Sequence, residues 1–105
     1  MVIIETPIFT RCIQAILDDD EYRLLQAQIV QKPYAGKIIP GSGGLRKLRW
    51  SAGTHGKRGG IRVIYYWFVL PEVVLMLFAY PKNEQDNLTP DQLKQLKKIV
   101  EGEYR

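Results

Sequence analysis

The sequence predicts an α+β domain in which two N-terminal helices and one C-terminal helix pack on a small antiparallel β-sheet. Two helix-start signals, each a hydroxyl cap followed by proline, occur at Thr6-Pro7 and Thr89-Pro90. Between them lie two apolar stretches rich in Val, Ile, Tyr, Trp and Phe, separated by Pro71-Glu72. A length of 105 residues suffices for one hydrophobic core and is too short for two, so residues 1–105 are expected to form one domain.

The first third of the chain predicts a strand and two helices. Met1–Glu5 is short, apolar and β-branched, and we expect it to join the edge of a sheet. After Thr6-Pro7, apolar residues recur at helical spacing as far as Leu17. Residues 18–21, three Asp and one Glu, predict the start of the second helix, because acids in a first turn interact favourably with the helix dipole. A metal-binding acid cluster is the weaker interpretation. The second helix is expected to stop before Pro33.

The remaining elements are three strands and a helix. Residues 33–44 are expected to be a connector whose glycines provide turns, since neither a helix nor a Gly-Lys-Ser/Thr ending follows as in a phosphate-binding loop. Residues 45–51 alternate as a strand does. Residues 61–70 and 73–80 are apolar at nearly every position, so we expect them at the centre of the sheet. The lysines of the last helix are expected to form a solvated face.

The composition excludes several classes of site. The single cysteine, Cys12, excludes an internal disulfide, and one Cys with one His gives no plausible zinc site, so we expect no metal and no cofactor. The apolar stretch 63–80 is long enough to span a membrane, but Pro71-Glu72 interrupts it. The N-terminus shows no basic leader followed by an apolar run. We therefore expect a cytoplasmic protein with no membrane partner.

A cationic segment without internal acids is the sharpest signal for function. The net charge is +4, and no Asp or Glu occurs between Tyr22 and Pro71. Period two places Lys47 and Arg49 on one face of their strand, and Arg62 begins the next strand. On adjacent strands these side chains would form a fixed positive surface that binds phosphates, and the basic net charge favours nucleic acid over an anionic membrane surface as the partner. Residues 41–50 and 56–66 within this segment hold six cations, Arg46, Lys47, Arg49, Lys57, Arg58 and Arg62.

Three sequence blocks in this order resemble the HigB branch of the RelE/ParE toxin superfamily. The blocks are residues 43–49 (Gly-Gly-Leu-Arg-Lys-Leu-Arg), residues 56–66 (Gly-Lys-Arg-Gly-Gly-x-Arg-Val-Ile-Tyr-Tyr) and residues 80–84 (Tyr-x-Lys-Asn-Glu). The similarity covers nearly the whole chain and implies a RelE-like fold. It also implies a type II toxin, a ribosome-dependent mRNA endonuclease that inhibits translation. The implied partners are a HigA-like helix-turn-helix antitoxin, mRNA and rRNA on the ribosome, and operator DNA through the antitoxin complex.

The resemblance assigns roles position by position. Lys47 and Arg49 match a pair of cations that faces the RNA, and Arg62 matches an arginine that contacts the scissile phosphate. The cation that commonly follows the third strand is replaced by Asn83, with Lys82 adjacent. Relatives also use a tyrosine near the C-terminus, for which this chain has no clear counterpart. The implied catalytic residues are Lys47, Arg49, Arg62 and Lys82, and the implied RNA-binding residues are Arg46, His55, Lys57, Arg58, Tyr66, Tyr80 and Asn83.

Cleavage of RNA without a metal proceeds by attack of the 2′-OH on the adjacent phosphorus. It requires a base for the hydroxyl proton, charge stabilisation on the phosphoryl oxygens and protonation of the leaving 5′ oxygen. Arg62 suits the second task, while Lys47 or another group such as His55 takes the proton. Arg49 or Lys82 could neutralise the leaving group. Two alternatives stay open, a ParE-like toxin that binds DNA gyrase without catalysis and an RNA-binding domain that does not cleave.

Overall fold

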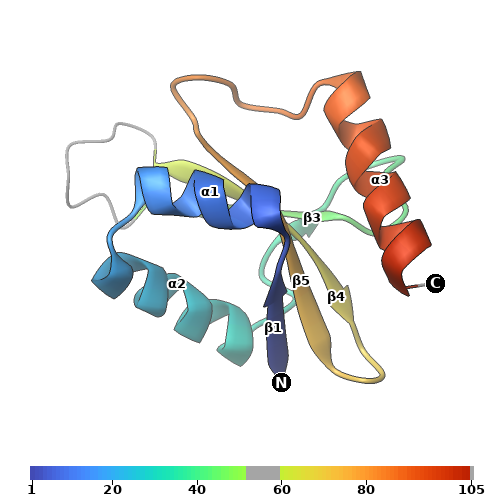
Figure 1. Ribbon diagram of the computed structural model, residues 1–105, viewed down its shortest axis with the longest axis horizontal. Coiled ribbons are helices and arrows are strands. Elements are labelled where there is room, and N and C mark those ends of the chain that lie inside the picture. Colours follow the sequence, from blue (N-terminus) through green and yellow to red (C-terminus); the bar gives the residue numbers. More distant parts are fainter. Residues whose placement is uncertain (52–59, 105) are drawn as a thin grey trace.

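A five-stranded sheet with the strand order β1-β5-β4-β3-β2 forms the centre of the protein, which is seen here in a computed structural model that describes residues 1–51 and 60–104 (Figure 1). The predicted α+β class is confirmed, with two helices before the main strands and one after them. The sheet is antiparallel except at β1, which pairs parallel to β5 at one edge. The elements are β1 (Val2–Glu5), α1 (Pro7–Ile16), α2 (Asp19–Gln31), β2 (Lys37–Ile38), β3 (Arg46–Trp50), β4 (Ile61–Phe68), β5 (Val73–Pro81) and α3 (Pro90–Tyr104).

Helices α1 and α2 begin at the caps that the sequence predicts and cover one face of the sheet. The side chain of Thr6 accepts a hydrogen bond from the Phe9 amide at 3.1 Å, and that of Asp18 accepts one from the Glu21 amide at 2.8 Å. The apolar sides of the two helices meet inward-facing strand residues in one buried cluster. Its members include Phe9, Ile13, Leu25, Ile29, Leu48, Val63, Tyr65 and Met76, and Cys12 packs against it.

Helix α3 covers the opposite face, so the protein has three layers, with the sheet between two layers of helix (Figure 1). Thr89 and Gln92 cap this helix reciprocally, as predicted, because each side chain bonds the other residue's amide. Leu96 and Val100 are buried against the sheet. The second cluster consists of Leu45, Ile64, Leu75, Leu77, Tyr80, Leu96 and Val100.

The apolar stretch 63–80 forms most of β4 and β5, two of the three inner strands, which pair along their length with one bulge at Ile64/Tyr65. The expectation that residues 61–70 and 73–80 lie at the centre of the sheet is therefore confirmed. None of the helices in the described part of the chain has the length and apolar character needed to cross a membrane. One element was not anticipated, because β2 pairs Lys37 and Ile38 with β3 inside the segment expected to be a connector.

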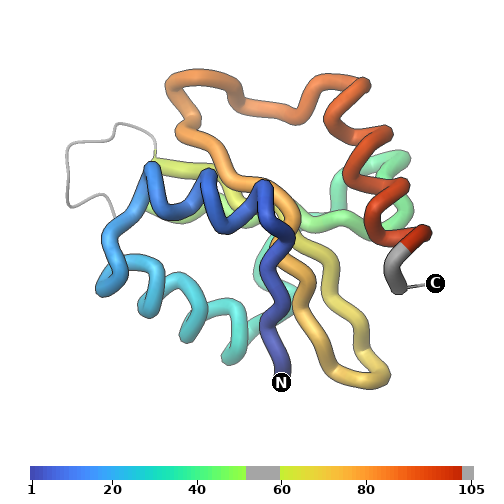
Figure 2. Tube along the Cα trace, in the orientation of Figure 1, coloured from blue at the N-terminus to red at the C-terminus, as the bar shows by residue number. Residues whose placement is uncertain are grey.

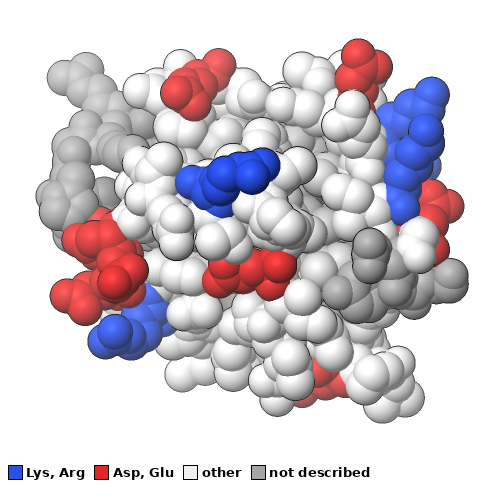
Figure 3. Space-filling view, viewed as in Figure 1, with Lys and Arg blue, Asp and Glu red and all other residues white. Residues whose placement is uncertain are grey.

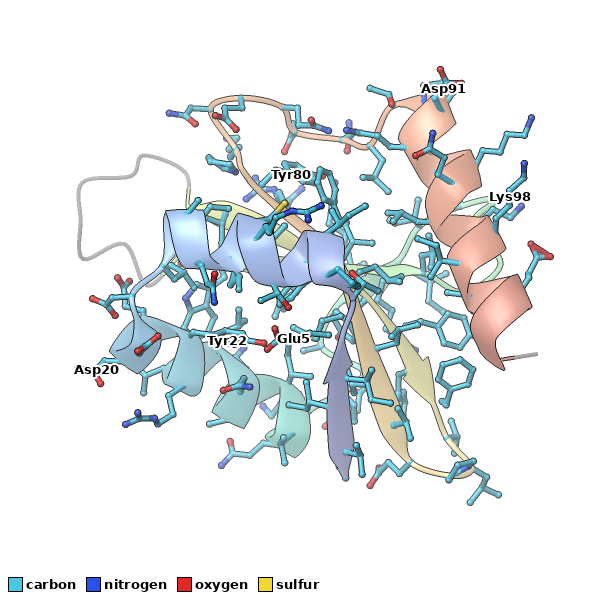
Figure 4. All side chains as sticks on the ribbon, in the orientation of Figure 1. Glu5, Asp20, Tyr22, Tyr80, Asp91 and Lys98 are labelled. Carbon is cyan, nitrogen blue, oxygen red and sulfur yellow. The ribbon has the colours of Figure 1, made fainter. Side chains whose placement is uncertain are left out.

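Two tyrosine hydroxyls fasten loops and helices to the sheet. The fully buried Tyr65 donates to the Pro33 carbonyl at 2.7 Å and accepts from the Gly36 amide at 2.8 Å. Tyr22 on α2 donates to a Glu5 carboxylate oxygen at 2.6 Å, and Figure 4 shows the two side chains pointing toward one another. Burial, reinforced by the Glu5 carboxylate, raises the pKa of Tyr22 far above its ordinary value. Both phenols therefore act as neutral donors that position the chain.

Replacement of Tyr65 by Phe is expected to lower the free energy of unfolding by about 1–3 kcal/mol, because it leaves a buried backbone N–H and a carbonyl without their partner. Urea unfolding measures this change. Tyr34→Phe is the matched control, since the Tyr34 side chain is 59% exposed. Equal effects of the two substitutions would contradict the role given to the Tyr65 hydroxyl.

Candidate nucleic-acid interface

Three side chains form a row across the sheet on the face that carries α3. The register pairs Arg49 of β3 with Arg62 of β4, and Arg62 with Tyr80 of β5. Directly paired residues point to the same face with Cβ atoms about 5 Å apart. Lys47 lies two residues before Arg49 and therefore shares that face. The fold thus places Lys47, Arg49 and Arg62 together, with Tyr80 beside them.

Arg62 is buried and paired with a carboxylate of the same chain. Only 5% of its side chain is exposed, and its Nη2 and Nε atoms lie 3.1 Å and 3.2 Å from Oδ1 of Asp86. Its Nη1 atom donates to the Ile61 carbonyl at 3.4 Å. A buried guanidinium is tolerated only with an anion or full hydrogen bonding. Asp86 meets this need from outside the sheet, with half of its side chain exposed to solvent.

Residues 82–89, which are called the strap here, connect β5 to α3 (Figure 2). Besides the Asp86 carboxylate, the strap offers the Asn87 side-chain oxygen, which accepts a hydrogen bond from Lys47 Nζ at 2.7 Å. The Tyr80 hydroxyl donates to the Asp86 carbonyl at 3.0 Å. Burial raises the pKa of Tyr80, and the Asp86 carboxylate adds to this while Arg62 opposes it. Arg62, Tyr80 and Lys47 therefore contact the strap directly. Arg49 lies opposite Arg62 in the sheet.

Among the residues that the structure describes, the exposed cations at the row are Arg49, which belongs to it, and Lys82. Arg49 is exposed on β3, and Lys82 is exposed as the first residue of the strap. Asn83, which takes the place of an expected cation, is exposed beside Lys82. These side chains lie near the C-terminal ends of β3 and β5, which is where the paired strand β4 places the buried Arg62.

The structure separates Arg46 from these residues. Its side chain lies on the face covered by α1 and α2, where it donates to the carbonyls of Gly36 at 2.8 Å and Tyr34 at 3.2 Å. The guanidinium also lies 5.7 Å from the ring centre of Trp67. Arg46 thus fastens the connector before β2 to the sheet and does not belong to the candidate interface.

Tyr66 shares a face with Arg62 but lies farther along the strand. The two residues are four positions apart, which corresponds to about 13 Å along a strand. The Tyr66 ring lies 4.5 Å from that of Phe68, and a Cβ added at Gly44 would lie only 3.0 Å from the ring. Tyr66 therefore packs against the glycine turn beside α3 rather than beside the row. The remaining expected contacts, His55, Lys57 and Arg58, lie outside the described residues.

The lysines of α3 form a separate positive group. Lys94 and Lys98 are exposed, and blue side chains at this helix are visible at the right of Figure 3. Lys97 donates to the Gly41 carbonyl at 3.2 Å, which links α3 to the turn before β3. Within residues 1–51 and 60–104, no group of three His, Cys, Asp or Glu side chains could hold a metal ion. The chemistry available at the row is therefore that of guanidinium, ammonium, phenol and carboxylate groups.

Sequence reasoning missed Asp86 and Asn87, which belong to the site through the strap. A usable signal existed, because an arginine in an apolar central strand must become buried and so requires an anion. The acid-free segment from Tyr22 to Pro71 could not provide one locally. The first acids after β5 are Glu84 and Asp86, and of these the fold uses Asp86.

The chain matches no known protein-family model. The interpretation of the row therefore depends on its geometry and on the sequence resemblance.

The phenols predict how stability depends on pH. Tyr65 and Tyr80 have an ordinary pKa of 10.0 that burial raises in the folded protein. Above about pH 10 the unfolded chain releases these protons and the folded chain retains them, so the free energy of unfolding falls as the pH rises. Urea unfolding between about pH 8 and pH 11 measures the slope. Tyr80→Phe is expected to make the decline shallower, and an unchanged slope in this variant would contradict the assignment.

Proposed function

We propose that the protein is the toxin of a type II toxin–antitoxin system, a ribosome-dependent endonuclease that cleaves mRNA and thereby inhibits translation. The observation that carries the proposal is the row in which Arg49 lies directly opposite Arg62, with Lys47 on the same face. Like charges placed opposite one another destabilise a sheet, so their presence favours a role in binding an anion. The blocks resembling HigB proteins agree with this role.

In the proposed reaction the 2′-OH attacks the adjacent phosphorus, and the cations act on the charges that develop. Arg62 stabilises the phosphoryl oxygens, for which the bidentate edge of a guanidinium is suited. Arg49 and Lys82 are both exposed. In the proposed reaction they contact the phosphodiester backbone of the RNA and offset the charge on the leaving 5′ oxygen. Lys47 is the candidate base, and the ribosome holds the mRNA in line for attack. The site acts in the cytoplasm, and a helix-turn-helix antitoxin neutralises it and links it to operator DNA.

One observation favours a second candidate, an RNA-binding domain that does not cleave. The Arg62 guanidinium already contacts Asp86, so in this arrangement its Nε–Nη2 edge faces a carboxylate and not solvent. A surface built from Arg49 and Lys82 could bind a phosphate backbone without any contribution from Arg62. The gyrase-binding alternative has no such observation in its favour.

The test of the proposal is cleavage of mRNA on purified ribosomes. The wild-type protein is expected to cut, and Arg49→Ala is expected to lower the rate about 100-fold, since it removes one charged donor from the phosphate. Arg11→Ala is the control, because Arg11 is exposed on α1, which covers the other face. Arg62→Ala is a poorer test, since removal of a buried, paired side chain also lowers stability.

If the wild-type protein binds RNA but leaves mRNA intact on ribosomes, the second candidate, an RNA-binding domain that does not cleave, replaces the endonuclease. Intact mRNA together with blocked DNA supercoiling by gyrase would favour the ParE-like alternative. Full activity of Arg49→Ala would remove the row from the mechanism.

A further inference from the structure

The edge of Arg62 that faces Asp86 is the edge that binds oxyanions in proteins. A guanidinium presents its donors in a rigid plane, and its Nε–Nη2 side is one of two edges that can pair with a carboxylate or a phosphate. Here Oδ1 of Asp86 receives both atoms of this edge, at 3.2 Å and 3.1 Å. The Asp86 carboxylate therefore occupies the place that a phosphate oxygen would take on Arg62.

The same short segment also covers Lys47. The Lys47 Nζ atom donates to the Asn87 side-chain oxygen at 2.7 Å. Asn87, the residue after Asp86, thus takes up a donor of the second cation of the row, Lys47. A phosphodiester bound at the row would need the donors of both Arg62 and Lys47. Because Asp86 and Asn87 are neighbours on one strap, one displacement of the strap would remove the Asp86–Arg62 and Asn87–Lys47 contacts together.

The contacts that hold the strap are mostly polar and close to solvent. Lys82, Asn83, Glu84, Asp86 and Asn87 are all exposed, and Leu88 is the strap residue that packs on the second cluster. Contacts of this kind are weak and are among the first to open in a folded protein. Gln85 Nε2 donates to Gln92 Oε1 at 2.9 Å and to the Asn87 carbonyl at 3.0 Å, so the strap also contacts α3 without the Asp86 carboxylate. The α3 cap formed by Thr89 and Gln92 involves neither Asp86 nor Asn87, so their displacement leaves this cap in place.

We infer that the strap is an intramolecular gate on an anion site, in which Asp86 and Asn87 occupy the phosphate positions of Arg62 and Lys47 until the phosphodiester backbone of single-stranded RNA displaces them. This inference rests on the proposed function for its ligand, since it takes RNA as the anion that the row binds. Binding of RNA and opening of the strap are then coupled, so a change that favours the open strap raises the affinity for RNA by the same factor.

The test compares Asp86→Asn with Glu84→Gln in binding a labelled single-stranded RNA of about 12 nucleotides. Both variants remove one negative charge from the exposed strap, but only Asp86 contacts Arg62. Asp86→Asn is expected to bind RNA about five-fold more tightly than the wild-type protein at low salt, because a competing unit charge at contact distance is removed. Glu84→Gln is expected to gain less than about two-fold. Affinity of Asp86→Asn equal to or below that of Glu84→Gln would overturn the gate.

Two further measurements keep the test decisive if Asp86→Asn is unstable. Asn87→Ala leaves the ion pair intact and is also expected to tighten binding, because it frees Lys47. In the wild-type protein, amide hydrogen exchange of residues 82–88 is expected to become faster when RNA binds, as the strap opens. Slower exchange of these amides would show that RNA binds over a closed strap, and would overturn the gate.

The failure of the gate and that of the proposed function give different results. If Arg49→Ala weakens RNA binding while Asp86→Asn does not tighten it, the interface stands and the gate is wrong. If Asp86→Asn tightens binding but no variant cleaves mRNA on ribosomes, the gate stands on an RNA-binding domain. If neither the wild-type protein nor Asp86→Asn binds RNA at low salt, both proposals are wrong.

Discussion

A guanidinium buried in the central strand is the constraint on which the rest of the site depends. Arg62 lies in β4 with only 5% of its side chain exposed, so it requires an anion within reach. The chain contains no acid from Tyr22 to Pro71, and the carboxylate must therefore come from a distant segment. Asp86, 24 residues later, provides it. This pairing fixes the path of the strap between the end of β5 and the cap of α3.

The fold could be predicted where local chemistry decides it. The starts of α1, α2 and α3 follow from caps that involve residues three apart, such as Thr6 with Phe9 and Thr89 with Gln92. The inner hairpin follows from two apolar stretches around a proline turn. Period two likewise placed Lys47 and Arg49 on one face of β3.

Features that depend on contacts between distant segments could not be predicted in the same way. β2 consists of Lys37 and Ile38 alone and exists only because β3 lies beside it, so its residues carry no strand signal of their own. Arg46 is next to Lys47 in sequence, but side chains alternate along a strand, so it lies on the other face of the sheet. There it donates hydrogen bonds to carbonyls of the preceding connector. No sequence pattern marks Asp86, which lies in a polar connection after β5, and only the burial of Arg62 gives it a role.

The same ion pair serves stability and limits access, and this explains how the row can exist in a folded protein. Arg49 opposite Arg62 brings two like charges together across β3 and β4, which by itself disfavours the sheet. Asp86 offsets that repulsion from one side and leaves Arg49 exposed on the other. An anionic ligand that replaces Asp86 offsets the same repulsion, so the sheet stays neutralised whether the strap is closed or a phosphate is bound. An acid fixed inside the sheet could not make way for a ligand, whereas a carboxylate on an exposed connection such as Asp86 can move aside.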